Sequence, residues 1–121
     1  MRVLDGEQLL VRIFIGESDR WKHQPLETAL LERLRREGFA GATVFRGTSG
    51  FGAHSVLHTS HLLELSHDLP VLIEVVESED HVQRLLPILE EMVHEGLVTM
   101  EKVRVLKYAA GPAKPGPGGG R

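Results

Sequence analysis

The sequence predicts one α+β domain with the element order β-α-β-β-α-β, which is the ferredoxin-like arrangement. Two segments repeat apolar residues with the helical period of about 3.6, and four others are rich in β-branched or alternating apolar residues. The chain has 121 residues, near the commonest size of a single domain, so one hydrophobic core is expected. We therefore expect an antiparallel sheet with both helices on one of its faces.

The first strand and the first helix follow from the apolar pattern of residues 9–38. Residues 9–15 alternate between two faces that are both largely apolar, which predicts a strand in the centre of the sheet. Pro25 suits the first turn of a helix because an N–H there has no helical partner, and Gly38 suits the C-terminal end. The helix between them is expected to bury Leu26, Ala29, Leu30 and Leu34.

The second helix is expected to follow two strands, at residues 42–45 and 69–76. Ser78 is a suitable N-cap, because its hydroxyl can accept a hydrogen bond from an unpaired backbone N–H. Gly96 is expected to end this helix, and Pro87 to bend or break it at a cost of about 3 kcal/mol. Its apolar stripe comprises Val82, Leu85, Leu86, Leu89, Met92 and Val93.

The remaining residues complete the sheet and leave a tail. Residues 97–98 and 103–106 predict a final strand or a pair of strands. From Ala109 onward the sequence is almost all Gly, Pro and Ala, which offer nothing to bury in a core. We therefore expect a ferredoxin-like domain at residues 1–108 and a disordered Gly/Pro-rich tail at residues 109–121.

Composition excludes several classes of function. The net charge of -3 lacks the basic excess that nucleic acids and anionic membranes attract, so no nucleic-acid partner is expected. The chain has no cysteine, which rules out a disulfide framework and a thiolate metal site or nucleophile. No apolar run approaches the about 18 residues of a membrane span. We expect a soluble cytoplasmic protein without direct membrane insertion.

Two features of this predicted fold point to a function. The connection between the second and third strands, at about residues 47–68, is far longer than a hairpin loop, which usually has about 2 to 5 residues. Long loops in compact domains are often functional. The sheet also has one face without helices, although the strand at residues 9–15 is apolar on both faces. Another subunit is the simplest cover for that face.

The segment RGTSGFG at residues 46–52 resembles the signature of the PII-like proteins grouped as the uncharacterised-domain family 190, in the GlnB-like superfamily. The neighbouring sequence is similar to that family in order and spacing from about Leu9 to Tyr108. The matching stretches are residues 13–19, 25–26, 38–44, 58–59, 65–66, 68–70 and 73–76.

The resemblance implies a homotrimer in which the sheets line a central core and the long loop is the analogue of the PII T-loop. It also implies a regulatory protein rather than an enzyme. Clefts between subunits would bind an adenine nucleotide as effector, with no required cofactor, and the loop would signal to a membrane transporter or a metabolic enzyme. PII proteins hold phosphates with a Gly-Asp-Gly-Lys loop before the last strand, whereas residues 95–102 contain a single glycine. A smaller or less charged nucleotide is therefore at least as good a candidate as a triphosphate.

The signature segment supplies five candidate ligand-binding residues. Gly47, Gly50 and Gly52 can let the backbone approach a ligand and present amides to an anion, or they can supply positive φ at a tight strand exit. Arg46 can bind a phosphate or carboxylate through two N–H groups, or form a surface ion pair. Phe51 can stack on a base or pack against a neighbouring subunit.

Other candidates lie outside the signature. Glu17 and Asp19 follow the first strand and can bind a ribose hydroxyl or an amine, or lie in a solvated turn. Lys102 and Arg104 share a face of the last strand and can line a phosphate cleft between subunits, or protect an edge strand. His58 matches the family and is a candidate for a ligand or structural contact. Glu74 needs a charged partner in its apolar strand, such as an ion pair at a trimer interface.

Two other functions compete with the sensor hypothesis. His54, His58 and His61 would share one face of a helix, so a trimeric divalent-metal-binding module is the main alternative. A nucleotide hydrolase is the other, but the sequence has no cysteine, nucleophile elbow, Walker A element or paired carboxylates. Fold class does not decide among these functions, because ferredoxin-like domains support many activities.

Overall fold

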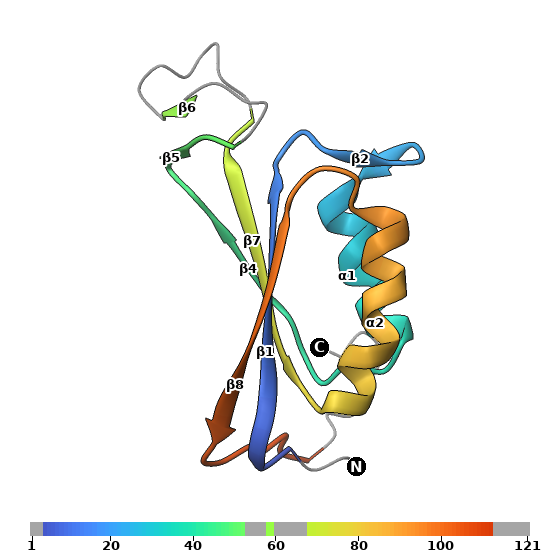
Figure 1. Ribbon diagram of the computed structural model, residues 1–121, viewed down its shortest axis with the longest axis vertical. Helices are drawn as coiled ribbons and strands as arrows, with labels where there is room; N and C mark the ends of the chain where they lie inside the picture. Colours follow the sequence, from blue (N-terminus) through green and yellow to red (C-terminus); the bar gives the residue numbers. More distant parts are fainter. Residues whose placement is uncertain (1–3, 53–57, 60–67, 113–121) are drawn as a thin grey trace.

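The computed structural model (Figure 1) describes residues 4–52, 58–59 and 68–112. Its main sheet has four antiparallel strands in the order β4-β7-β1-β8, and both helices cover the same face. The order and the layers confirm the predicted ferredoxin-like fold. The elements are β1 (Gly6–Gly16), α1 (Leu26–Arg36), β4 (Thr43–Arg46), β7 (Pro70–Glu77), α2 (Glu79–Met92) and β8 (Leu97–Val105).

Two short ribbons add to this framework at one end of the sheet (Figure 1). One is a hairpin of β2 (Arg20–Trp21) and β3 (Gln24–Pro25), whose Trp21 ring stacks on His94 beyond α2, with centroids 6.3 Å apart. The other pairs β5 (Ser49–Gly50) with β6 (His58–Thr59) inside the long connection. Neither ribbon was predicted, because two-residue strands are too short to show a period.

The core lies between the sheet and the helices. Alternate residues of β1 and β7 are buried on this face. These two strands occupy the centre of the sheet, a position that was predicted for β1. The sheet contributes Val11, Ile13, Ile15, Val71, Ile73 and Val75 to this core.

α1 agrees with the prediction in detail. It buries Leu26, Ala29, Leu30 and Leu34, and Gly38 follows its last turn with a φ of +81°, a conformation that favours glycine. Pro25 lies just before the helix rather than in its first turn. Basic residues in the last turn are favourably placed at the negative end of the helix dipole.

α2 corrects three predictions. The Ser78 hydroxyl caps it by accepting from the His81 N–H at 3.4 Å, as expected. The helix then runs unbroken through Pro87, which lies on the exposed side where water can hydrogen-bond to the carbonyl that loses its partner. It ends at Met92, before Gly96. Leu86, which was predicted to lie in the buried stripe, is 37% exposed. Ile88 is buried in the stripe instead.

No helix in the described part of the chain is long and apolar enough to cross a membrane. The final strand is a single one, β8, and not a pair. Residues 109–112 lie outside any helix or strand, and the rest of the predicted tail, residues 113–121, lies outside the described residues.

The face without helices carries an apolar row across all four strands. The register places Phe45 opposite Leu72, Leu72 opposite Phe14, and Phe14 opposite Leu97. Two of these side chains remain about half exposed, Phe45 at 48% and Leu97 at 56%. We call these four residues the transverse apolar row. A face of this kind commonly contacts another protein surface.

An ion-paired row lies next to the transverse apolar row. Arg12 Nε donates to Glu74 Oε2 at 2.9 Å, and its Nη1 donates to Glu101 Oε1 at 3.2 Å. The hydrogen bond to Glu74 is the main reason that the pKa of Arg12 is raised. Glu74 therefore finds its partner within its own chain.

Glu77 joins the segment after α1 to the start of α2 through hydrogen bonds. Its side chain is fully buried (0% exposed), and its carboxylate accepts from the Ala40 N–H at 2.7 Å and the Ser78 N–H at 2.8 Å. The first donor belongs to the connection between α1 and β4, and the second to the start of α2. A carboxylate this deeply buried is tolerated because it is hydrogen-bonded.

We expect Glu77→Gln to lower the free energy of unfolding by about 1–3 kcal/mol, because its amide group would turn a donor toward a backbone donor. Urea denaturation followed by circular dichroism measures the change. Glu32→Gln, at an exposed position of α1, is the matched control and should change stability by less than about 0.5 kcal/mol. Equal stability of the two variants would contradict this role of Glu77.

Candidate functional site

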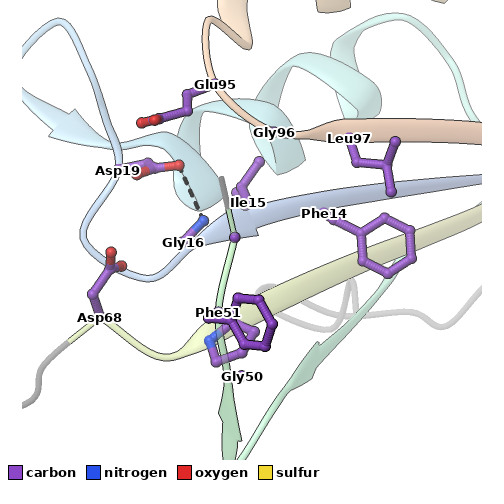
Figure 2. A pocket seen from close by; sticks show the side chains of 12 residues that line it. Phe14, Ile15, Gly16, Asp19, Gly50, Phe51, Asp68, Glu95, Gly96 and Leu97 are labelled. Carbon is purple, nitrogen blue, oxygen red and sulfur yellow. Dashed lines mark hydrogen bonds between the residues drawn. The ribbon is translucent and has the colours of Figure 1, made fainter. Parts of the chain in front are cut away.

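A pocket of about 500 Å³ opens at the end of the sheet where β1 ends and β8 begins (Figure 2). It is formed by the exit of β1, the first residues of the long connection, the start of β7 and the turn between α2 and β8. Its lining residues are Phe14, Ile15, Gly16, Asp19, Gly50, Phe51, Gly52, Asp68, Pro70, Glu95, Gly96 and Leu97.

Glycines in this region allow the chain segments to approach closely. A Cβ on Gly50 would lie 2.8 Å from Pro70 Cγ, and one on Gly47 would lie 3.1 Å from the same atom. A Cβ on Gly96 would lie 2.5 Å from the backbone oxygen of Phe14. Neither Gly47 nor Gly50 has a positive φ. The Pro70 ring therefore leaves no room for a side chain at Gly50 and crowds one at Gly47, whereas turn geometry requires neither glycine.

The pocket has an apolar side and an acidic side. Figure 2 shows Phe14 and Leu97 on one side, the ring of Phe51 in the middle, and three carboxylates on the other. Phe51 is 78% exposed, which is unusual for a phenylalanine and leaves its ring available to a ligand. Aromatic rings at the mouth of a pocket favour flat, apolar ligand groups.

The acidic side comprises Asp19, Asp68 and Glu95, from three separate connections. Asp19 Oδ2 accepts from the Gly16 N–H at 3.0 Å, and Asp68 Oδ1 accepts from the Ser18 N–H at 2.9 Å. Partial burial raises the pKa of Asp19 above 3.8; the negative charges of Asp68 and Glu95 raise it further, and the bond from Gly16 lowers it.

Neither Asp68 nor Glu95 is among the site residues predicted from the sequence. Each comes shortly before a strand that begins at this edge of the sheet, and Asp68 also lies in the stretch 68–70 that resembles the family. These two signals could have found them. Among the described residues, no lysine, arginine or histidine lines the pocket. The pocket of a single chain is thus apolar on one side and negatively charged on the other.

Arg46 lies outside the pocket, in an ion-paired cluster with Glu17. Its Nη2 donates to Glu27 Oε1 at 2.8 Å, and its Nε donates to Glu17 Oε2 at 3.4 Å. Arg46 lies on the same face of β4 as the partly buried Val44, which packs on the core, so it points toward α1. The structure therefore brings two predicted site residues, Arg46 and Glu17, together as an ion pair outside the pocket.

Lys102 and Arg104 are remote from the pocket within one chain. They follow Leu97 by five and seven residues along β8, which corresponds to about 16 and 23 Å of extended strand. Lys102 Nζ lies 4.0 Å from Glu7 Oε1, and both side chains are exposed at the edge of the sheet. Their position fits the protection of an edge strand.

The histidines predicted for a metal site are only partly placed. The backbone of His58 pairs with Gly50 in the ribbon of β5 and β6, while His54 and His61 lie outside the described residues. Within residues 4–52, 58–59 and 68–112, no three histidine, cysteine or carboxylate side chains are grouped to hold a metal ion. The metal hypothesis therefore gains no support from the described residues.

Comparison with known proteins identifies relatives over most of the chain. The family model of DUF190, described as an uncharacterized ACR family, matches residues 8–105. A UPF0166 protein of Aquifex aeolicus (strain VF5) is 36% identical over 106 residues, which cover 88% of this chain and 98% of the relative.

Solved structures of a PII-like protein share the fold. CPII, a nitrogen regulatory PII-like protein from Thiomonas intermedia K12, superposes with a TM-score of 0.60 when bound to ADP, AMP and bicarbonate, at 20% identity. That match covers 85% of this chain and 97% of CPII. A second CPII structure, bound to ADP and bicarbonate, gives a TM-score of 0.64 at 22% identity and covers 88% of this chain and 95% of CPII. Identities this low show the fold alone.

The raised pKa of Asp19 predicts how stability depends on pH. A carboxyl that binds its proton more tightly in the folded state stabilises the fold most below the unfolded-state value of 3.8. That contribution is lost as the pH rises through the folded-state pKa. The free energy of unfolding of the wild type should therefore fall, relative to that of Asp19→Asn, as the pH rises from about 3 through the folded-state pKa of Asp19.

Urea denaturation across this pH range measures the difference between the two proteins. Glu90→Gln, at an exposed position of α2 outside the pocket, is the control and should show a much smaller trend against the wild type. A difference between wild type and Asp19→Asn that stays constant, or rises in favour of the wild type, would contradict the burial and repulsion described for Asp19.

Proposed function

The chain belongs to the DUF190 family, and on this premise we propose that it is a PII-like signalling protein, not an enzyme. It binds a small effector, an adenine nucleotide, in the pocket of Figure 2 and signals through the loop after β4. The fold that it shares with CPII supports this proposal. A membrane transporter or a metabolic enzyme is the proposed client.

One observation carries the proposal. Gly50, Phe51 and Gly52 line the pocket, and they are also the first part of the long connection between β4 and β7. A ligand on these residues contacts the rigid end of the sheet and the base of the loop at once. Binding therefore favours the loop conformations that make this contact, which is how a ligand shifts a conformational equilibrium.

The size and lining of the pocket suit a nucleoside-sized molecule. Its volume of about 500 Å³ falls within the about 300–1,000 Å³ of typical ligand pockets. The exposed ring of Phe51 and the apolar side chains of Phe14 and Leu97 offer surfaces for a flat base. CPII, which has the same fold, is bound to ADP and AMP, so these two nucleotides are the appropriate first probes.

We expect AMP or ADP to raise the melting temperature of the full chain, because a ligand that binds only the folded state stabilises it by mass action. Phe51→Ala should weaken the affinity for the same nucleotide about tenfold or more, since stacking on an aromatic ring contributes about 1–3 kcal/mol per base. Isothermal titration calorimetry measures the affinity.

Leu106→Ala is the matched control, because Leu106 is an exposed apolar residue that does not line the pocket. It should bind nucleotide as the wild type does. Absence of binding by both nucleotides, or equal weakening by the two variants, would contradict the proposed site.

We also propose that the protein is a homotrimer whose sheets face one another. The transverse apolar row supports this assembly, because no element within residues 4–52, 58–59 and 68–112 covers its half-exposed side chains. Removing apolar surface from water stabilises an interface by about 25 cal/mol per Å². Lys102 and Arg104 would contact an effector only if a neighbouring copy brought them to its pocket.

Light scattering coupled to size-exclusion chromatography tests the assembly. The wild type should have a mass of about 40 kDa, three times the 13.4 kDa of one chain. Phe45→Asp places a charge in the row without touching the pocket and should give a folded monomer. Leu86→Asp, on the exposed side of α2, should remain trimeric. A wild-type monomer, or a trimeric Phe45→Asp, would overturn this assembly.

A further inference from the structure

Residues 68–70 contact both walls of the pocket in Figure 2, and we call them the bridging segment. One wall is the turn after β1, at residues 16–19, and the other is the start of the long connection, at residues 47–52. The bridging segment ends that connection and begins β7. Its contacts therefore determine how firmly the two walls are held relative to each other.

Backbone hydrogen bonds and close packing join the bridging segment to both walls. The Leu69 carbonyl accepts from the Glu17 N–H at 2.9 Å, and the Pro70 carbonyl accepts from the Gly47 N–H at 2.8 Å. The Pro70 ring also lies where a side chain at Gly50 would have to be. Leu69 and Pro70 are thus fixed to opposite walls although they are neighbours in the chain.

Asp68 extends this pairing into the turn with its side chain. The ladder of β1 and β7 ends with Gly16 opposite Pro70. Two residues beyond Gly16, the Ser18 N–H donates to Asp68 Oδ1 at 2.9 Å. A hydrogen bond to a carboxylate is stronger than one between neutral groups. The carboxylate therefore holds a backbone amide that lies beyond the paired strands.

Gly16 leaves the space that the Asp68 carboxylate occupies. A Cβ at position 16 would lie 2.6 Å from Asp68 Oδ1 and 3.1 Å from its Oδ2, so the whole carboxylate would have to move. Because the aspartate side chain is short, that movement would take Oδ1 away from the Ser18 N–H. Gly16 has no positive φ, so its backbone conformation is open to alanine. One hydrogen bond can therefore be broken independently at two residues.

The turn that Asp68 holds is a local unit that contributes Asp19 to the pocket. Asp19 Oδ2 accepts from the Gly16 N–H at 3.0 Å, and the Asp19 carbonyl accepts from the Leu26 N–H at 2.8 Å, at the start of α1. An ion pair of Glu17 with Arg46 also connects the turn to β4, but at 3.4 Å between exposed side chains it contributes little. The bridging segment is therefore the main connection between the turn and the long connection.

We propose that Asp68 is a positioning residue, which fixes the turn after β1 against the end of the long connection so that a ligand meets both walls in one arrangement. This inference rests on the proposed function, since it assigns Asp68 a role in that site. Asp68 acts through the oxygen that accepts from the Ser18 N–H, so an amide can replace the carboxylate. Order that the fold supplies before binding raises the affinity for a ligand.

Amide hydrogen exchange at Ser18, resolved by NMR on the full chain without ligand, tests the hydrogen bond itself. Asp68→Ala and Gly16→Ala should each speed this exchange about tenfold, which corresponds to about 1.4 kcal/mol. The double variant should be no faster than either single variant, because both changes break the same bond and their effects do not add. Asp68→Asn should stay close to the wild type, because its side-chain oxygen can still accept from the Ser18 N–H.

Titration calorimetry with AMP tests the effect on the site. Asp68→Ala and Gly16→Ala should weaken the affinity severalfold and to the same extent as the double variant, while Asp68→Asn should bind AMP nearly as the wild type does. Direct contact of AMP with the carboxylate, or a clash with the new methyl group, would instead give effects that add.

Two variants are matched controls for these changes. Gly41→Ala adds a methyl group with no atom within 4 Å beyond its chain neighbours, and Gly41 has no positive φ. Glu90→Ala removes an exposed carboxylate from α2. Neither should alter exchange at Ser18 or the affinity for AMP. Circular dichroism of each variant confirms that it is folded before rates and affinities are compared.

The outcomes separate this inference from the proposed function. Exchange at Ser18 that Asp68→Ala leaves unchanged, or that Asp68→Asn speeds as much as Asp68→Ala does, would overturn the positioning role and leave the nucleotide proposal standing. Faster exchange with an unchanged affinity for AMP would overturn it as well, because the bond would then serve the fold alone. A wild type that bound neither AMP nor ADP would overturn the proposed function, while exchange at Ser18 would still decide whether Asp68 holds the turn.

Discussion

The antiparallel register of β1 on β7 is the constraint on which the site depends. It sets Ile13 opposite Ile73 in the core, and it sets Gly16 opposite Pro70 at the end of the sheet. Because a shift by one residue would turn the buried face of a strand outward, the core fixes this register strongly. The strand exit at Gly16, the base of the long loop and Asp68 are held together as a consequence. The geometry of the site is thus set by packing in the core, several residues away along the strands.

The periodic parts of the fold could be predicted from the sequence. α1 buries the four residues that its pattern indicates, and the order of the main strands agrees with their apolar character. Predictions failed where they rested on the local sequence alone, without the surroundings of the residue in the fold. Pro87 does not break α2, and on the exposed side of the helix water can replace the hydrogen bond that the proline removes. Trp21 belongs to a two-residue strand, which carries no periodic signal.

The site was predictable only where residues are contiguous in sequence. The signature at residues 46–52 identified Gly50, Phe51 and Gly52, and all three line the pocket. Asp68 and Glu95 come from other connections, so only the three-dimensional fold brings them to Asp19. Anion binding and a surface ion pair were both predicted for Arg46, and the structure shows ion pairs with Glu17 and Glu27. The positive charge of Arg46 could be read from the sequence, but its two partners could not.

Hydrogen exchange in the presence and absence of AMP tests the central claim most directly, namely that one pocket joins the end of the sheet to the base of the loop. The fold predicts slower exchange on binding at residues 47–52 and 95–97, which meet at the pocket, and unchanged exchange at residues 31–36 in the second half of α1. Protection confined to residues 31–36, or absent from residues 47–52 at saturating nucleotide, would contradict it.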